Sequence, residues 1–388
     1  MDISRHMIWS MYMHKLLKTI SLISILILLF TACSSKEVSN LSQESEPVPQ
    51  SATTYTGEDV KTIGISMPAA QLERWHIDAD LLKTLFEDAG YNVLLSYGDN
   101  LIDAQINDIN QMIDQGAQLL IISPVDSDSL GPCIENANKK NIPIVAYDRL
   151  IYHNPNLLAY VSYDNYMVGQ LQAQYIVDAL DLDNIDSDRC FNLEIFSGDS
   201  ADNNAIYFYD GAMSILSSYI NDGKLKVLSN QTSFYSTSIS SWDTELACER
   251  MEIMLSSYYG TNQQLNAVLA ANDSIALGVC EAIDSSYNKD NQIIITGQDC
   301  DSCNIQNIKD EKQSMSIYKN LNNEAYATFC IVQNYLNGVS TGDDLTKGYD
   351  LDFTIRRDSD TYVSDNVYIT SYLLSPMVVT NANIDKVL

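Results

Sequence analysis

From Val60 onward, the sequence alternates short apolar runs rich in β-branched residues with longer stretches of helical periodicity. Residues 62–67 form the first apolar run, and residues 72–89 then place apolar side chains on one face of a helix that Gly90 ends. The same pair of patterns recurs along the chain. Strands that alternate with helices pack into a parallel sheet with helices on both faces. The sequence therefore predicts an α/β fold.

The strands predicted by this pattern fall into two sets. The first set covers residues 62–67, 91–97, 117–123 and 142–147, and the second covers residues 159–163, 191–197, 225–229, 266–271 and 292–296. Helices are expected between them, over residues 72–89, 102–115, 127–140, 165–181, 203–220, 242–257 and 273–284. A chain of 388 residues is long enough for two packed cores. The sequence has no Gly-rich phosphate-binding motif, so nucleotide binding is not supported.

The first sixty residues have a different character. Two lysines precede the apolar run 20–30, and two small residues lead from that run to Cys33. This order predicts an export signal, and the apolar run is too short to span a bilayer comfortably. The segment Leu-Phe-Thr-Ala-Cys at residues 29–33 resembles a bacterial lipobox. That resemblance implies a signal peptide over residues 1–32 and a lipid anchor on Cys33, with acyl chains such as palmitate. An ordinary membrane anchor, or a cleaved signal with an incidental cysteine, is the alternative.

Residues 33–59 are rich in Ser, Thr, Glu, Gln and Pro and almost lack large apolar side chains. Such a stretch cannot bury enough surface to offset its ordering entropy, so we expect a flexible tether. The folded part would then be held by lipid on the extracytoplasmic side of the cell membrane. The formal net charge of −29 repels nucleic acid, which makes DNA or RNA an unsuitable partner.

Seven cysteines follow Cys33, an odd number that cannot pair completely within one chain. Most lie among apolar residues and are expected to be small buried side chains. Cys300 and Cys303 have the CxxC spacing, which suits a redox or metal site. No second pair and no nearby histidine complete a zinc set. We therefore expect no metal and no cofactor.

Polar and aromatic residues stand at the carboxyl ends of the predicted strands, where open α/β sheets bind their ligands. They are Glu73, Arg74, Trp75, Asp148, Arg149, Asp164, Asn165, Asp202, Asn203, Asn204, Asn272, Asp273, Gln298 and Asp299. Trp242 opens a predicted helix in the same register. Singly, an Asp or Asn after a strand suits a helix N-cap, and Asp164, Asn203 and Asp273 are candidates for that role. An Arg there suits a structural ion pair, and a Trp suits the core.

Taken together, these side chains suit a sugar. Each sugar hydroxyl donates and accepts a hydrogen bond, so carboxylates can accept from it and guanidinium or amide groups can donate to it. A planar Arg side chain can hold two adjacent oxygens. The C–H faces of a pyranose need a flat apolar partner, which an indole ring offers. Both tryptophans beyond the signal, Trp75 and Trp242, fall at predicted ligand-facing ends.

Eight short motifs resemble the D-xylose-binding proteins of the periplasmic binding protein family, whose relatives bind ribose and galactose. They are Glu73-Arg74-Trp75, Ala146-Tyr147-Asp148-Arg149, Ser162-Tyr163-Asp164-Asn165, Gly169-Gln170-Leu171-Gln172-Ala173, Asp202-Asn203-Asn204-Ala205, Ala271-Asn272-Asp273, Gly297-Gln298-Asp299 and Met315-Ser316-Ile317-Tyr318-Lys319. The resemblance covers residues 60–388. It departs in the longer segment 232–241, at Cys300, where the family has a small residue, and over residues 347–372, which match weakly.

The resemblance implies a type I periplasmic binding protein, with two doubly wound parallel-sheet lobes joined by a multi-strand hinge. The N-terminal lobe would comprise residues 60–162 plus about 320–372, and the C-terminal lobe residues 163–319 plus about 373–388. A monosaccharide, D-xylose above other aldoses, would be captured between the lobes for import by ABC permease subunits. The implied sugar-contacting residues are Arg74, Trp75, Asp148, Arg149, Asp202, Asn204, Trp242, Asn272, Asp299 and Lys319.

Two other functions compete with import. The same lobes could serve as a sensor that signals to a chemoreceptor or a histidine kinase, and the sequence does not separate these partners. A glycosidase would need an acid with a raised pKa, whereas Arg74, Arg149 and Lys319 are expected to keep the neighbouring carboxyls ionised. We therefore expect a monomeric binding protein with no catalytic residue, and not an enzyme.

Overall fold

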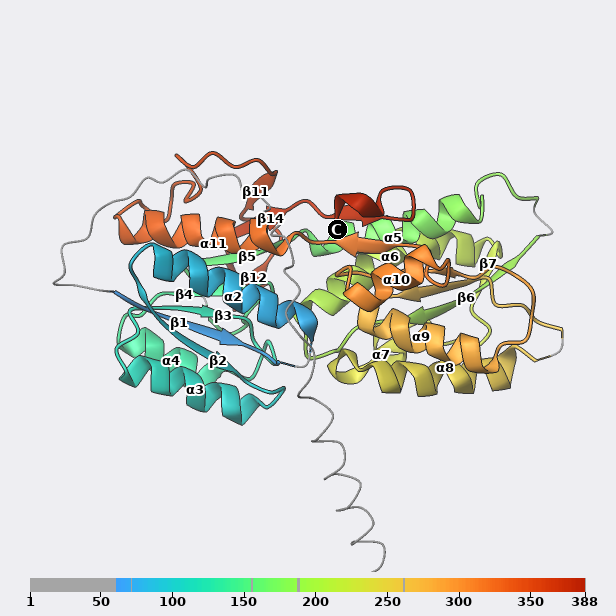
Figure 1. The fold of residues 1–388 in the computed structure, drawn as a ribbon, viewed down its shortest axis with the longest axis horizontal. Helices are drawn as coiled ribbons and strands as arrows, with labels where there is room; N and C mark the ends of the chain where they lie inside the picture. The colour runs from blue at the N-terminus through green and yellow to red at the C-terminus, as the bar shows by residue number, and fades with distance from the viewer. Residues whose placement is uncertain (1–60, 71, 155, 187–188, 261, 388) are drawn as a thin grey trace, which may run out of the picture. The chain divides into compact units, whose positions relative to one another are not determined.

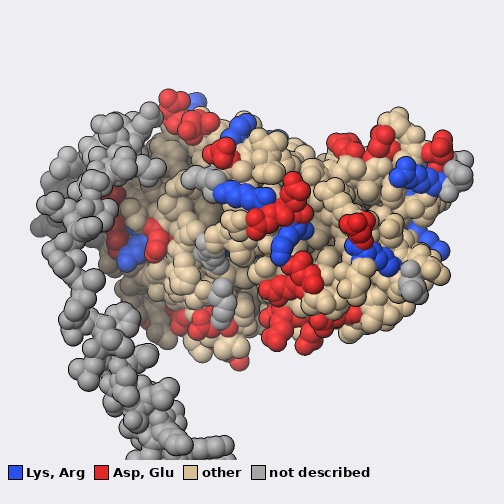
Figure 2. Space-filling view, turned by 45° about the vertical axis from the view of Figure 1, so that its right-hand side comes forward, with Lys and Arg blue, Asp and Glu red and all other residues tan. Residues whose placement is uncertain are grey.

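The computed structural model describes residues 61–70, 72–154, 156–186, 189–260 and 262–387, which all belong to one compact unit (Figure 1). The predicted signal peptide, the predicted lipidation site Cys33 and the predicted tether lie outside the described residues. Among the described helices, none combines the length and the apolar character that a membrane crossing requires. On the face shown in Figure 2, Asp and Glu side chains gather in clusters.

The first sheet has seven strands in the order β11-β14-β5-β4-β3-β1-β2. Their bounds are β1 Thr62–Met67, β2 Asn92–Tyr97, β3 Leu119–Ile122, β4 Ile144–Tyr147, β5 Ala159–Tyr163, β11 Ile355–Asp358 and β14 Ser371–Leu374. All neighbours are parallel except β11, which pairs antiparallel with β14 at the edge. Helices α2 (Glu73–Asp88) and α11 (Leu321–Leu336) cover one face, and α3 (Ile102–Asp114) and α4 (Gly131–Lys139) cover the other. We call this sheet with its helices the first lobe.

The second sheet has four parallel strands in the order β7-β6-β8-β9. Their bounds are β6 Phe191–Phe196, β7 Leu225–Lys226, β8 Ala267–Ala270 and β9 Ile294–Ile295. Helices α5 (Asn165–Ala179) and α6 (Asn203–Asn221) pack on one face, and α8 (Thr244–Tyr258) and α9 (Asp273–Ser286) on the other. With α7 (Phe234–Thr237), α10 (Ser302–Lys309) and the pair β10 (Ser316–Tyr318) and β15 (Met377–Val379), these elements form the second lobe. A small hairpin, β12 (Val363–Ser364) and β13 (Val367–Tyr368), follows β11.

The chain passes between the two sheets after β5, between β10 and α11, and between β14 and β15. The predicted fold class, α/β with two doubly wound parallel sheets, is confirmed. Two predicted helices are wrong in their start. Trp242 does not open a helix but ends a 3-10 turn, Ser240–Trp242, and α8 begins at Thr244. The helix expected from residue 127 begins only at Gly131. The residue bounds proposed for the two lobes stay a prediction.

Helices α5 and α6 lie in unusually close contact because each contributes a glycine to the crossing. A Cβ atom on Gly169 would lie 1.9 Å from the carbonyl oxygen of Phe208, and one on Gly211 would lie 2.1 Å from that of Tyr166. Both distances are far below van der Waals contact. The crossing therefore depends on the absence of side chains at these two positions, and it fixes the end of α6 that carries Asn203 and Asn204.

Gly169→Ala should lower the free energy of unfolding by about 1–3 kcal/mol, because the two helices must separate to admit the methyl group. Gly131→Ala is the matched control, since an added Cβ at this first residue of α4 meets no heavy atom within 4 Å. Alanine is also the better helix former, so the control should be neutral or slightly stabilising. Urea titrations of both variants decide the point, and equal losses would contradict the helix-crossing argument.

Candidate functional site

The carboxyl ends of the strands in both lobes border one cavity with about 290 Å³ of space free of protein atoms. Its lining residues are Leu72, Arg74, Trp75, Asp148, Arg149, Asp202, Asn204, Phe208, Trp242, Asn272, Gln298, Asp299 and Lys319. All ten residues selected from the sequence are therefore brought together here.

Three lining residues, Leu72, Phe208 and Gln298, were not selected from the sequence. Phe208 lies four residues after Asn204 in α6 and so shares its helical face, a signal that the sequence did contain. Leu72 directly precedes α2. Gln298 follows a predicted strand but lies outside the set of sugar-contacting residues that the family resemblance implies.

Each lobe contributes residues through the turns that follow its strands. The first lobe supplies Arg74 and Trp75 from the first turn of α2, and Asp148 and Arg149 after β4. The second lobe supplies the other six of the ten residues. Asp202 and Asn204 lie at the start of α6, Asn272 lies at the start of α9, and Trp242 lies in the turn before α8. Asp299 follows β9, and Lys319 follows β10. The strand order of both sheets therefore brings these residues together around the cavity.

Two of the lining residues are also helix N-caps. The Asp202 side chain accepts a hydrogen bond from the Asn204 amide, and the Asn272 side chain accepts one from the Ile275 amide. Capping and lining the cavity are therefore not exclusive roles. Asn203 and Asp273, which the sequence suggested as caps, lie inside α6 and α9 instead. Asp164 does cap α5 and is not among the residues that line the cavity.

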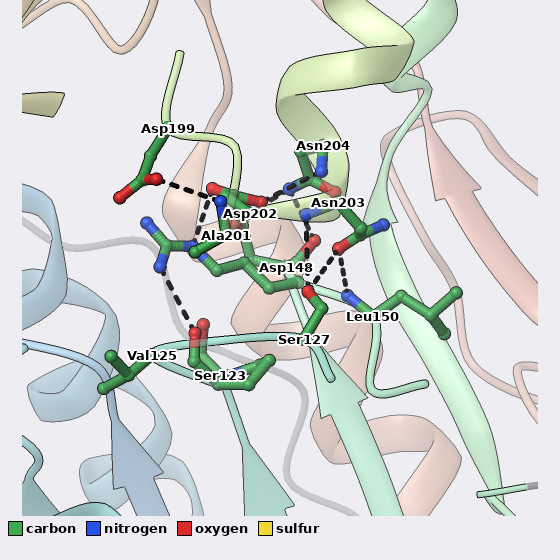
Figure 3. Close-up of polar contacts among 12 residues, drawn as sticks. Ser123, Val125, Ser127, Asp148, Leu150, Asp199, Ala201, Asp202, Asn203 and Asn204 are labelled. Carbon is green, nitrogen blue, oxygen red and sulfur yellow. Dashed lines mark hydrogen bonds and ion pairs between the residues drawn. The ribbon is translucent and has the colours of Figure 1, made fainter. Parts of the chain in front are cut away.

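The start of α6 touches the first lobe directly (Figure 3). The side-chain oxygen Oδ1 of Asn203 accepts from the backbone amide of Leu150 at 2.7 Å, and the side-chain Nδ2 of Asn204 donates to the backbone carbonyl of Asp148 at 2.9 Å. The Asn165 side chain in turn donates to the side-chain oxygen Oδ1 of Asn204 at 2.8 Å, so it holds the Asn204 side chain in place. These contacts hold the first turn of α6 against the loop that carries Asp148.

The charged lining residues form an almost completely buried network. Arg74 lies 2.9 Å from Asp148 and 3.3 Å from Asp299, and Lys319 lies 3.5 Å and 3.2 Å from the same two carboxylates. Arg149 forms an ion pair with Asp202 at 2.8 Å. Three of these pairs, Arg74–Asp299, Lys319–Asp148 and Arg149–Asp202, join one lobe to the other. In this arrangement the polar groups that face the cavity are held in fixed positions by their opposite charges.

Asp148 and Asp202 have pKa values that are shifted in opposite directions. Burial alone would raise the pKa of Asp148, but Arg74, Lys319 and Arg149 outweigh it and lower the pKa to about 2. Asp148 is therefore an ion at neutral pH, as the sequence led us to expect. Burial raises the pKa of Asp202 above its usual value although Arg149 opposes the shift.

Behind the cavity wall, Arg74 is contacted by two further carboxyls that the sequence analysis missed. Asp78, one helical turn along α2, accepts from Arg74 at 3.2 Å and from the Tyr147 hydroxyl. Glu324 of α11 lies 3.8 Å from Arg74, and neither of its buried oxygens has a hydrogen-bond partner among the described residues. Burial, with Asp148 nearby, raises the pKa of Glu324 well above its usual range. The spacing of four between Arg74 and Asp78 is a signal that could have been read from the sequence.

Burial raises the pKa of Asp78 to about 6, although Arg74 and Tyr147 oppose the shift. The unfolded carboxyl titrates near pH ~4, so the folded chain binds more protons between these two values and its stability falls as the pH rises through them. Asp78→Asn should remove this fall, on the order of 2 kcal/mol. Urea titrations across this pH range test it, with exposed Asp80→Asn as the control. Parallel curves for the wild type and Asp78→Asn would contradict the prediction.

The backbone around the cavity is strained at three lining residues. Asp148, Trp242 and Asp299 have φ angles of 58°, 56° and 100°. Such conformations cost about 1–3 kcal/mol each and gather at ligand sites, where the surrounding structure maintains them. Gly198 leaves room for the indole ring of Trp242, because a Cβ atom at Gly198 would lie 2.0 Å from that ring. The indole is thus placed by a conformation that its own side chain disfavours.

The Trp75 ring also contacts two arginines of the charged network. The guanidinium carbons of Arg74 and Arg149 lie 4.5 and 5.2 Å from the centroid of its ring. Cations at this distance are attracted by the indole ring, which helps to orient both arginines. Stacking of a sugar on Trp75, which the family resemblance implied, stays a prediction.

The model of the family described as "periplasmic binding protein domain" matches residues 63–340, most of the described chain. The chain belongs to this family. A relative, the multiple sugar-binding periplasmic receptor ChvE of Rhizobium radiobacter, is 35% identical over 85% of this chain and 90% of its own length. The D-xylose-binding periplasmic protein of Haemophilus influenzae is 35% identical over 68% of this chain and 73% of its own.

The solved structures agree. An ABC transporter solute-binding protein from Clostridium phytofermentans with bound β-D-glucose is 39% identical, covers 84% of this chain and 96% of its own, and superposes with a TM-score of 0.77. The family predicted from the eight motifs is confirmed, and with it the prediction of an extracytoplasmic binding protein that is not an enzyme. The xylose branch of the family is not singled out.

Proposed function

We propose that this periplasmic binding protein captures an aldose, D-xylose or D-glucose in its pyranose form, in the cavity between its lobes for an ABC importer. The observation that carries the proposal is the convergence of the ten lining residues chosen from the sequence on one small, buried cavity. The relatives are named as binding multiple sugars or D-xylose, and the similar solved structure holds glucose. Xylose differs from glucose in lacking the hydroxymethyl group.

The network supports capture by closure of the lobes. Carboxylates and cations in the cavity are held by one another, so a sugar hydroxyl meets charged partners that are already positioned. The three ion pairs between the lobes form only when the lobes are together. A bound sugar would add hydrogen bonds to both sides of the same cavity and so favour the closed form. A closed form can then be distinguished from an open one by the permease.

Titration calorimetry tests the proposal. The chain from Ser34, which retains every described residue, is titrated with D-xylose and D-glucose and, for comparison, with D-galactose, L-arabinose and D-ribose. A heat of binding for xylose or glucose is expected, with weaker binding for epimers whose hydroxyls leave buried groups unpaired. The absence of heat with all five sugars would sink the proposal. The ratio of the xylose and glucose affinities fixes the pentose or hexose preference.

Sensing is the alternative function, and one relative is itself named a receptor. A closed lobe surface could engage a chemoreceptor or a histidine kinase as well as a permease. Neighbouring genes for a permease and an ATPase favour import, whereas genes for a kinase and a response regulator favour sensing. Capture of the sugar-loaded, monomeric protein by membranes of the host separates the partners directly.

We also propose that the mature chain begins at Cys33 and is anchored through lipid on that residue, with residues 33–59 as the tether. The support is the lipobox resemblance at residues 29–33. Cys33→Ser should release the protein from the membrane fraction, and mass spectrometry should find acyl chains on the wild type only. Equal membrane retention of both would contradict the anchor.

A further inference from the structure

The polar atoms of the cavity wall fall into two classes. Most are paired with one another, as in the network of Arg74 and Lys319 with the carboxylates of Asp148 and Asp299. Arg149 Nε is held by Asp202 at 2.8 Å. Three other wall atoms are buried and have no hydrogen-bond partner among the described residues: Trp75 Nε1, Trp242 Nε1 and Gln298 Oε1.

Unpaired buried polar atoms are uncommon in native structures because desolvation without a partner is costly. Trp75, Trp242 and Gln298 are 2%, 5% and 2% exposed, so water does not reach them freely. All three line the same cavity, and the two indole N–H groups are donors whereas the amide oxygen is an acceptor. A ligand that completes this wall must therefore offer both acceptors and a donor, as a hydroxyl group does.

The position of Gln298 is fixed by its backbone. The Gln298 carbonyl accepts from the Asp273 amide at 2.9 Å, and the residue pairs with Ile317 across a bridge that continues β9 toward β10. The residues on either side are held too, because Gly297 accepts from the Ile317 amide and Asp299 donates to the Ile317 carbonyl. The side chain thus starts from a rigid point, as a specificity-determining contact requires.

Gln298 and Asp299 both line the cavity although they are adjacent in the chain. Successive side chains of an extended chain point to opposite sides. Asp299 departs from the extended conformation with a φ of 100°, and this turn brings its carboxylate to the same side as the amide. The local strain therefore places a carboxylate and an amide oxygen side by side on one wall, where both can accept from hydroxyls.

Resting on the proposed function, we propose that Gln298 is a further specificity-determining residue that accepts a hydrogen bond from one hydroxyl of the bound sugar. The carboxylates of the wall are already shared with Arg74, Lys319 and Arg149, whereas Gln298 Oε1 has no other donor among the described residues. The sugar hydroxyl opposite it must donate. A deoxy sugar that lacks this hydroxyl leaves the amide oxygen buried and unpaired.

Gln298→Met tests the inference, because methionine has a similar length and no amide. The parent sugar is whichever of D-xylose and D-glucose binds the wild type more tightly, and the probes are its monodeoxy and monofluoro analogues. Calorimetry should show the parent sugar weakened 5- to 100-fold by Gln298→Met. One deoxy analogue should bind the wild type less tightly than the parent sugar does, and it should bind Gln298→Met as tightly as the parent sugar does. Its fluoro counterpart should bind the wild type no better, since fluorine cannot donate.

The control is Ser96→Ala in β2. The Ser96 hydroxyl oxygen is also buried without a hydrogen-bond partner among the described residues, but Ser96 does not line the cavity. Its sugar affinity should equal that of the wild type. If Gln298→Met melts far below the wild type, Gln298→Ala takes its place in the same panel. Unchanged affinity for the parent sugar, or the same loss for the parent and every deoxy analogue, would overturn the inference. If the wild type binds no sugar at all, the proposed function itself has failed.

Discussion

Arg74→Met should abolish measurable sugar binding and lower the free energy of unfolding by about 3–5 kcal/mol at neutral pH. Arg74 is the cation nearest to the centre of the buried network, with Asp148, Asp78, Asp299 and Glu324 at 2.9, 3.2, 3.3 and 3.8 Å. Methionine fills a similar volume but leaves Asp148 and Asp299 with Lys319, and it leaves Asp78 and Glu324 with no ion-pair partner among the described residues. Removing one partner of a buried pair leaves uncompensated charge, which costs more than the pair itself contributes.

The loss should be smaller near pH 5 than near pH 7. Asp78 already has a pKa raised to about 6 and Glu324 one well above its usual range, and without Arg74 both would bind protons more readily. Once they are neutral, there is less unpaired charge to bury. Urea titrations at both pH values measure the difference.

Lys83→Met is the matched control, because Lys83 and Glu87 form an ion pair on the same helix but with side chains 43% and 49% exposed. Exposed pairs of this kind contribute about 0–1 kcal/mol. If Arg74→Met costs no more than Lys83→Met, the network around Arg74 does not stabilise the first lobe and the argument from buried charge is wrong.

The strands β1 to β9 were predictable because parallel strands covered on both faces leave continuous apolar runs in the sequence. The strands in the last third of the chain were harder to predict from the sequence. Strand β11 has the sequence Ile-Arg-Arg-Asp at a sheet edge, and β12 and β13 have two residues each, so no apolar run marks them. The antiparallel edge of the first sheet therefore came from the structure alone.

The site was predictable where its residues follow strands, since the topology alone brings strand ends together. What the sequence could not supply is the geometry between elements. The φ of 56° at Trp242 opposes the preference of the residue itself, so nothing in the sequence marks the turn that precedes α8. Likewise, Glu324 meets Arg74 only because α11 returns to the first sheet beside α2, a contact between residues 250 positions apart.

Arg149→Met should weaken sugar binding by 100-fold or more, about 3 kcal/mol, with a smaller effect than Arg74→Met on stability without sugar. The difference lies in where the partners are. Arg74 pairs with Asp78 and Asp148 of its own lobe, so it is needed whether or not the lobes are together. Arg149 pairs with Asp202 of the other lobe, so its loss leaves a buried carboxylate unpaired only in the closed form.

Adding Asp202→Asn should restore closure without restoring full affinity. Asparagine caps a helix as well as aspartate does, so the start of α6 keeps its bond to the Asn204 amide while the unpaired charge is removed. X-ray scattering at saturating sugar should then find the double variant as compact as the wild type and Arg149→Met more expanded, while calorimetry finds both variants weak. A double variant as expanded as the single one would mean that Arg149 acts on the sugar alone. The pair with Asp202 would then contribute nothing to holding the two lobes together.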